Sequence, residues 1–226
     1  MLRAVIFDFD GVITDSEVLH FRAFNKILAD FGIIITLKDY YKNYLGLSDF
    51  DLFSLLASKG RLRLKELTVE DLIKKKNVIF EKLAKTEGQI IEGVRPFIEM
   101  LGKNNIPMAI CSGALLVEIE MVLEDADLKR YFRAVVSAEQ VSKGKPDPQG
   151  FLLALERLNN NSEDKIKPSE CVVIEDSHWG IEAAKNAGMH IVAVTNSYDA
   201  SQFRGGEKFV TRLDELKIED LQSLCS

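Results

Sequence analysis

The stretch AVIFDFDGVI, residues 4–13, contains the features that decide the fold. Its apolar, β-branched and aromatic residues predict a buried strand, which runs directly into Asp8, Asp10 and Gly11. If Asp8 is still extended, side-chain alternation turns Phe9 to the opposite face and returns Asp10 to the face of Asp8. Two carboxylates in one small space repel each other, so they share a proton or attract a cation. The alternative is that D-x-D-G is an ordinary turn, because Asp and Gly are common turn residues.

The composition is that of a globular protein. The chain has 226 residues, of which 46% are hydrophobic, enough to form a core. The formal net charge of -6 argues against a nucleic-acid partner, because binding to phosphates requires a basic surface. The densest basic cluster is Lys74, Lys75 and Lys76, and since a helix spreads these side chains around its axis, we expect at least two to be solvated.

Cysteine usage and hydropathy give expectations about the compartment. Cys111, Cys171 and Cys225 have no C-x-x-C spacing, so neither a zinc site nor a disulfide framework is predicted. The first two lie in apolar runs, where they should behave as small hydrophobic residues. There is no leader-like segment at the N-terminus, and no apolar run approaches the roughly 18 residues that cross a bilayer. We therefore expect a cytoplasmic protein without a membrane partner, and a monomer, although no sequence pattern sets the oligomeric state.

The order of periodic patterns predicts an α/β fold with an insertion. Helical spacing of apolar residues dominates from about residue 15 to residue 88, with Ser48 and Thr68 as helix N-caps. Beyond this segment, strands are predicted at 106–111, 134–137, 171–174 and 190–194. They alternate with helices at 96–101, 115–123, 149–158 and 178–187, while the polar residues 159–168 read as a loop. Strands that alternate with helices of about ten residues indicate a parallel sheet covered on both faces.

Polar residues follow three of the predicted strands. Asp8 and Asp10 follow the first, Ser112 and Gly113 follow the second, and Glu175, Asp176 and Ser177 follow a later one. In open parallel sheets, ligands bind at the carboxyl ends of the strands, so these groups should meet in one crevice.

Ser112, Gly113 and Lys145 are suited to bind an anion. Ser112 and Gly113 precede a helix, whose free N–H groups favour an anion. Lys145, between Gly144 and Pro146, can extend an ammonium group into the same crevice. Each residue alone also has a purely structural explanation, as a helix cap or a solvated turn residue.

Four ordered motifs together carry a resemblance. They are DFDGVITD (8–15), the CSG of residues 111–113, GKPDP (144–148) and IEDSxxGIEAAKNAG (174–188), and they span the chain. The sequence resembles the haloacid dehalogenase superfamily, in the group that includes β-phosphoglucomutases and small phosphosugar phosphatases. The resemblance implies a Rossmann-like parallel sheet core with helices on both faces, built from residues 1–15 and 89–226. It also implies an inserted α-helical cap domain at residues 16–88, with hinges near residues 16–18 and 88–92.

The resemblance also assigns roles to the clustered residues. Asp8 would attack phosphorus to form an aspartyl-phosphate, and Asp10 would protonate the leaving oxygen and then deprotonate water. Mg²⁺ would be the cofactor, because a hard cation prefers oxygen ligands. Ser112, the Gly113 N–H and Lys145 would hold the transferring phosphoryl group. The implied metal ligands are Asp8, the backbone carbonyl of Asp10 and Asp176, with Glu175 near the ion or in the layer of residues just outside these ligands.

The inserted segment contains two candidate substrate residues. In similar mutases a histidine at the position of His20 helps to position cap and substrate, and the alternative is a histidine on the helix surface. Lys76 is a candidate contact for the far end of a substrate. His178 and Trp179 follow the acidic motif, and we expect both to be packing or capping residues rather than catalytic ones.

Three other functions compete with that of a phosphatase. A phospho-receiver module also uses a strand-end Asp, but it lacks a helical insertion and is about half as long. A carbon–halogen hydrolase lacks the acid at position 10.

A β-phosphoglucomutase shares the core residues. Such mutases place an arginine where this chain has Asp49, and polar residues where it has Ala114, Leu115 and Leu116. We therefore expect hydrolysis of a small phosphorylated metabolite, with the mutase as the alternative.

Overall fold

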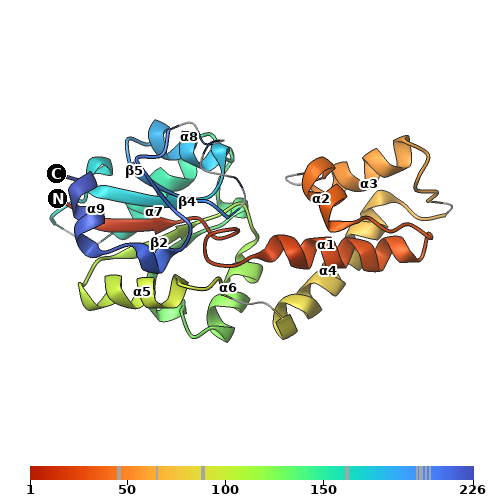
Figure 1. Cartoon of the computed structure of the whole chain (residues 1–226), viewed down its shortest axis with the longest axis horizontal. Coiled ribbons are helices and arrows are strands. Elements are labelled where there is room, and N and C mark those ends of the chain that lie inside the picture. The colour runs from red at the N-terminus through yellow and green to blue at the C-terminus, as the bar shows by residue number, and fades with distance from the viewer. Residues whose placement is uncertain are drawn as a thin grey trace. The chain divides into compact units, whose positions relative to one another are not determined.

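The computed structural model describes most of the chain, which divides into two compact units (Figure 1). One unit contains residues 1–15 and 89–226, and the other contains residues 16–88. The described residues are 1–44, 47–64, 66–87, 90–160, 163–196, 198, 201, 203 and 205–226. Gly46 of the turn before Asp49, and Gly88 and Gln89 of the second predicted hinge, lie outside them.

The larger unit is built on a six-stranded sheet whose strand order is β3-β2-β1-β4-β5-β6. All of its strand pairs are parallel, which confirms the predicted α/β fold class. The chain first moves from β1 outward to β3, then returns to the other side of β1 with β4. The order therefore reverses at β1, where parallel α/β sheets open a crevice for ligands. The strands are β1 (Ala4–Phe7), β2 (Met108–Cys111), β3 (Phe132–Val136), β4 (Cys171–Glu175), β5 (His190–Val194) and β6 (Lys208–Val210).

Helices cover both faces of this sheet, as the alternation of buried residues requires (Figure 1). Val5 and Phe7 pack with residues of α5 (Val94–Lys103), α6 (Leu116–Asp125) and α9 (Ile218–Leu224). Ala4 and Ile6 point the other way and pack with α7 (Gln149–Leu158) and α8 (His178–Asn186). Because each face of β1 is buried, its run of apolar residues is continuous, as a central strand of a parallel sheet demands.

The smaller unit is helical and has its own core. It contains α1 (Ser16–Ala29), α2 (Leu37–Asn43), α3 (Asp49–Ser58) and α4 (Val69–Glu87). The predicted N-caps are present: Ser48 accepts a hydrogen bond from the Asp51 N–H, and Thr68 accepts one from the Asp71 N–H, each at 3.1 Å. Phe24, Leu28, Phe53, Leu56 and Leu72 belong to one buried cluster.

Several element boundaries differ from the predicted ones for local reasons. The strand predicted at 106–111 begins at Met108, because Pro107 has no N–H to donate to a ladder. The helix predicted from Pro96 begins two residues earlier, after Gly93, whose φ of 91° suits a residue without a side chain. No periodic pattern predicts β6 or α9, which have only 3 and 7 residues. Among the described helices, none has the length and apolar character needed to cross a membrane.

Candidate active site

The acidic turn after β1 is shaped by backbone hydrogen bonds and by one glycine. The Asp8 N–H donates to the Ile174 carbonyl at 2.9 Å, so the first acid still extends the ladder to β4. The chain then turns sharply, since the N–H groups of Ile13 and Thr14 both donate to the Phe9 carbonyl. Gly11 has a φ of 77°, and a Cβ atom there would lie 1.8 Å from Asp176 Oδ2. Glycine is thus required both by the turn and by the close approach of the acid that follows β4.

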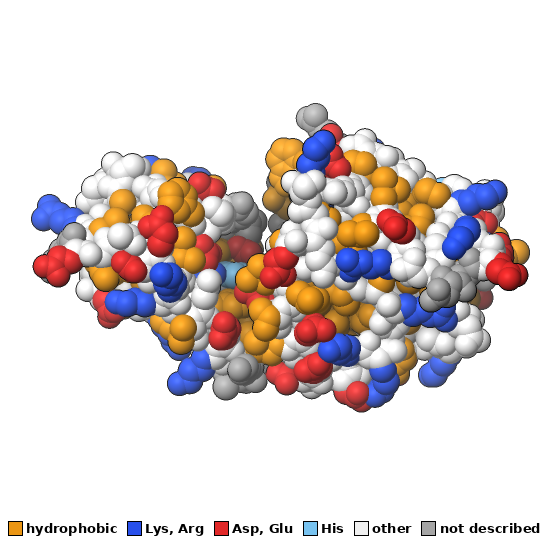
Figure 2. Space-filling view, turned by 180° about the vertical axis from the view of Figure 1, so that it is seen from behind, with side chains coloured by type: hydrophobic (Ala, Val, Ile, Leu, Met, Phe, Trp, Pro, Cys, Tyr) orange, Lys and Arg blue, Asp and Glu red, His pale blue; other side chains and the backbone are white. Residues whose placement is uncertain are grey.

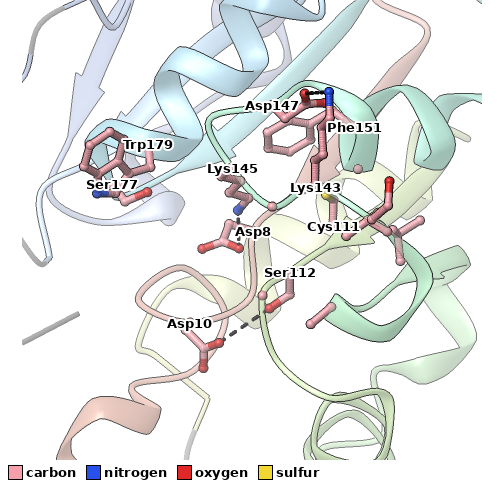
Figure 3. A pocket seen from close by; sticks show the side chains of 17 residues that line it. Asp8, Asp10, Cys111, Ser112, Lys143, Lys145, Asp147, Phe151, Ser177 and Trp179 are labelled. Carbon is pink, nitrogen blue, oxygen red and sulfur yellow. Dashed lines mark hydrogen bonds and ion pairs between the residues drawn. The ribbon is translucent and has the colours of Figure 1, made fainter. Parts of the chain in front are cut away.

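Lys145 joins acids from two neighbouring strands. Its Nζ donates to Asp8 Oδ1 at 2.6 Å (Figure 3). It also donates to Glu175 Oε1 at 2.6 Å. All three side chains are largely buried, and Glu175 is fully so. Burial raises the pKa of Asp8 to about 7, opposed by the Lys145 charge and reinforced by the charges of Glu175 and Asp10. Burial alone would lower the pKa of Lys145, but the two carboxylates outweigh it and raise that pKa.

The second oxygen of Glu175 is held by the start of α8. Glu175 Oε2 accepts hydrogen bonds from the Asp176 N–H at 2.8 Å, the Ser177 N–H at 2.7 Å and the Ser177 hydroxyl at 3.0 Å. The Ser177 hydroxyl also caps α8, accepting from the Gly180 N–H. A Cβ atom on Gly180 would lie 1.5 Å from Glu175 Oε1, so this glycine leaves the space that the carboxylate fills. Glu175 is therefore fixed between Lys145 and the first turn of a helix.

Three buried carboxylates are close enough to share a cation. Asp8, Glu175 and Asp176 each offer an oxygen, and these oxygens lie within 4.8 Å of one another. Buried carboxylate oxygens are the donors that Mg²⁺ and Ca²⁺ prefer, so the residues present fit a hard divalent ion. The Asp10 carboxylate is not among the three, and the contribution expected from Asp10 is its backbone carbonyl. That contribution stays a prediction.

Asp10 and Ser112 lie on another side of Asp8 (Figure 3). The Ser112 hydroxyl is 3.5 Å from Asp10 Oδ2, and it accepts a hydrogen bond from the Ala114 N–H at 2.9 Å. The Ser112 N–H continues the sheet by donating to the Val136 carbonyl at 2.9 Å. A side chain on Gly113 would meet nothing within 4 Å, so this residue presents open backbone beside the serine. The two acids of the motif therefore occupy different surroundings, one paired with an ammonium group and one with a hydroxyl group.

A cavity of about 510 Å³ joins these groups. Of the residues predicted from the sequence, it is lined by Asp8, Asp10, Ser112, Gly113 and Lys145. Among the other lining residues are Cys111, Phe151 and Trp179, none of which was predicted as a site residue. Cys111 is a buried free thiol, and burial raises its pKa to about 12, which suits the predicted hydrophobic role. Nothing in the sequence around Phe151 marks it as a lining residue, because its spacing is that of any core position of α7.

The two residues after Ser177 have opposite environments, which corrects one expectation. His178 packs as predicted, with ring centroids 4.7 Å from Tyr198 and 5.4 Å from Phe203. Trp179 was also expected to pack or to cap the helix, but it is 62% exposed and lines the cavity. The reason lies in helix geometry: consecutive residues of α8 point about 100° apart, so when His178 faces its ring neighbours, Trp179 faces outward.

His20 and Lys76, the two candidates in the inserted segment, are in contact within the smaller unit. Lys76 Nζ lies 2.6 Å from His20 Nδ1 and donates to both oxygens of Asp49 at 2.9 Å. The His20 ring stacks on Phe80 at 4.1 Å, so it is not a free surface histidine. Burial, and secondarily the Lys76 charge, lower the pKa of His20 to about 3. Lys76 is 1% exposed, whereas Lys74 and Lys75 are exposed, as predicted for two of the three lysines.

The fold and the site define an α/β enzyme with acids, a lysine and a serine at the switch point of a parallel sheet. Comparison with known proteins gives the family: residues 5–194 match the model of the haloacid dehalogenase-like hydrolases, and the chain belongs to that family. It is 34% identical over 192 residues to a phosphorylated carbohydrates phosphatase of Thermotoga maritima, covering 83% of this chain and 82% of that protein.

Two further similar proteins are β-phosphoglucomutases. A β-phosphoglucomutase of Bacillus subtilis is 29% identical over 222 residues, with 96% of this chain and 93% of that protein covered. The crystal structure of a β-phosphoglucomutase from Clostridium difficile superposes with a TM-score of 0.76 at 26% identity, covering 100% of this chain and 97% of that one. The chain is thus an enzyme of the family's phosphatase and phosphosugar mutase group.

Proposed function

We propose that this protein is a magnesium-dependent phosphatase that hydrolyses small phosphomonoesters, and phosphosugars in particular, through an aspartyl-phosphate. The observation that carries the proposal is the position of Asp8, which lines the cavity with one oxygen 2.6 Å from the Lys145 ammonium group. A carboxylate held beside a cation at the opening of a crevice is suited to attack an electrophile that carries negative charge. The phosphatase relative supports a phosphorylated carbohydrate as the substrate class.

Two half-reactions follow from the two acids. Asp8 attacks the phosphorus atom, the bond from phosphorus to the leaving oxygen breaks, and Asp10 donates a proton to that oxygen. Asp10 then takes a proton from a water molecule, the water oxygen attacks phosphorus, and the Asp8 carboxylate is released with inorganic phosphate. Their different surroundings suit this division of roles, because pairs of acids in unlike environments separate into nucleophile and acid/base. Ser112, the Gly113 N–H and Lys145 bind the oxygens of the transferring group.

Asp8, Asp176 and Glu175 would hold Mg²⁺, together with the Asp10 carbonyl. When bound, the ion supplies positive charge that neutralises the phosphoryl oxygens. We expect excess chelator to abolish phosphate release from p-nitrophenyl phosphate. We also expect Asp176→Ala to raise the magnesium concentration needed for half-maximal activity. Full activity in chelator would remove the metal from the proposal.

The unit formed by residues 16–88 is proposed to act as a cap that excludes water during turnover. The ion pair between Lys76 and Asp49 in this unit favours hydrolysis over the mutase alternative. A mutase must hold the second phosphate of a bisphosphate, and Lys76 is the candidate cation, but both oxygens of Asp49 already accept hydrogen bonds from it. The pair has no net charge to offer to a second phosphate.

One assay separates the two activities. The protein is given β-glucose 1-phosphate with a trace of the 1,6-bisphosphate, and glucose 6-phosphate and free phosphate are both followed. We expect release of phosphate without accumulation of the isomer. Rapid formation of glucose 6-phosphate with little free phosphate would establish the mutase and refute the phosphatase. Steady turnover of p-nitrophenyl phosphate, in turn, excludes a receiver module, which would only accumulate phospho-aspartate.

A further inference from the structure

Trp179 is an exposed aromatic residue at the proposed active site. It is the only tryptophan of the chain, it is 62% exposed, and it lines the same cavity as Asp8 and Lys145. Within the part of the chain that the structure describes, its indole has no ring contact and its N–H makes no hydrogen bond. A large aromatic surface that remains in water, with its one polar group unused, is available to a ligand.

The local structure holds Trp179 in this position. Ser177 caps α8 by accepting from the Gly180 N–H at 3.0 Å, and His178 packs against Tyr198 and Phe203. These contacts on both sides fix the backbone of the first turn, so the outward direction of the indole follows from the helix rather than from a mobile loop. Figure 3 shows Trp179 and Ser177 on one side of Asp8 and Lys145, and Phe151 on the other.

The other exposed apolar side chains named here differ from Trp179 because they lie away from the cavity. Several other apolar side chains are exposed, among them Val117 on α6 and Leu152 on α7, and Figure 2 shows hydrophobic side chains scattered over one face of the molecule. Single exposed apolar residues are common and need no explanation. Neither Val117 nor Leu152 lines the cavity, whereas Trp179 does.

We propose that Trp179 determines substrate specificity by stacking against the ring form of the sugar whose phosphate reaches Asp8. This proposal rests on the proposed function. A sugar ring presents a flat face of C–H groups that matches the apolar face of an indole, and its hydroxyl groups can accept the free indole N–H. An open-chain polyol phosphate has the same phosphate and hydroxyl groups but no flat ring. The indole therefore favours cyclic over open-chain substrates of equal carbon number.

The test compares glucose 6-phosphate, which is a ring, with glucitol 6-phosphate, its open-chain counterpart. Trp179→Ala should lower kcat/KM for glucose 6-phosphate by about tenfold, the scale of one aromatic contact, mainly through KM. It should change kcat/KM for glucitol 6-phosphate by less than about twofold. Trp179→Phe keeps an aromatic face and should restore most of the preference for the ring. Leu152→Ala is the matched control, because Leu152 is an exposed apolar residue of the same unit outside the cavity.

A binding measurement uses the single tryptophan as its own reporter. In an Asp8→Asn variant, which cannot turn over substrate, glucose 6-phosphate should shift the tryptophan emission, whereas inorganic phosphate and glucitol 6-phosphate should not. If Trp179→Ala lowers kcat/KM equally for both substrates, or if glucose 6-phosphate leaves the tryptophan emission unchanged, the stacking role is overturned. The proposed phosphatase activity would stand in either case. If the wild-type protein hydrolyses neither of these two compounds nor β-glucose 1-phosphate, the phosphosugar function fails and this proposal fails with it.

Discussion

Replacing Lys145 by methionine should make the protein bind magnesium more tightly while making it a much poorer catalyst. Methionine keeps the approximate length of the lysine side chain and removes its charge. The ammonium group is 2.6 Å from Asp8 and 2.6 Å from Glu175, and both carboxylates are buried. The substitution therefore leaves Asp8 and Glu175 without the ammonium group that pairs with both of them.

The substitution should raise the affinity for magnesium and lower kcat, by different amounts. A double charge about 5 Å from a single like charge is repelled by about 1.7 kcal/mol even at the dielectric constant of bulk water. Removing the ammonium group should therefore strengthen magnesium binding by more than about tenfold. Loss of a group that stabilises the charge of a transferring phosphoryl typically costs about 10² to 10³ in kcat, and we expect a loss in that range here.

The assay measures kcat and KM for p-nitrophenyl phosphate over a magnesium titration, with magnesium affinity measured separately by calorimetry. Lys143→Met is the matched control: Lys143 lines the same cavity, but its side chain is 73% exposed and lies 3.6 Å from Asp147. The control should stay within about threefold of the wild type, since an exposed ion pair contributes little. Weaker magnesium binding in Lys145→Met, or a kcat close to that of the wild type, would refute the reasoning.

Two further predictions concern the acids and the histidine. Asp8→Asn should abolish turnover, because an amide is not a nucleophile, whereas Asp10→Ala should still permit slow phosphorylation of Asp8 by a donor with a good leaving group; near-native activity of Asp8→Asn, measured as phosphate release, would contradict the assignment. The pKa of His20 is lowered from 6.5 to about 3, so the unfolded chain binds the proton first and stability is lost as the pH falls from 6.5 towards 3. By pH 5 this amounts to about 2 kcal/mol relative to pH 8, and urea unfolding of His20→Gln should lack that part of the pH dependence. A stability difference between the two proteins that is the same at both pH values would show that His20 titrates normally.

The convergence of the site residues could be predicted because it depends only on topology. Once alternating strands and helices imply a parallel sheet, residues that follow its strands meet at one edge, and Asp8, Ser112 and Glu175 do so. The position of Lys145 was predicted, but its partners were not. The loop from Ser142 to Pro148 has no periodic pattern that fixes its path, so only the folded chain reveals the ion pairs with Asp8 and Glu175.

Other features depend on tertiary packing that a sequence pattern does not encode. The exposure of Trp179 follows from which residue of the first turn of α8 faces Tyr198 and Phe203, and Tyr198 lies 20 residues further along the chain from His178. Tryptophan is a large residue that is highly buried on average, so the motif alone favoured packing. Among the strands that the structure describes, the short strand β6 pairs only with β5, and its three residues carry too little alternation to be recognised.

The pairing of Asp49 with Lys76 bears most directly on the choice between hydrolysis and isomerisation. The core residues of the two activities are shared, so the distinction has to come from how a second phosphate is held. Lys76 is 1% exposed and keeps two charge-assisted hydrogen bonds to Asp49, whose side chain is 24% exposed, so separating the two charges leaves a buried ammonium group unpaired.

A second phosphate could recruit Lys76 only by displacing Asp49, and the displaced carboxylate would then repel the phosphate. A substrate whose far end has only hydroxyl groups does not need Lys76 to leave Asp49. The ion pair, which has no net charge, neither repels nor strongly attracts such a substrate. Under the proposed cap role of the helical unit, this charge arrangement favours a monophosphate over a bisphosphate, in agreement with the proposed hydrolysis.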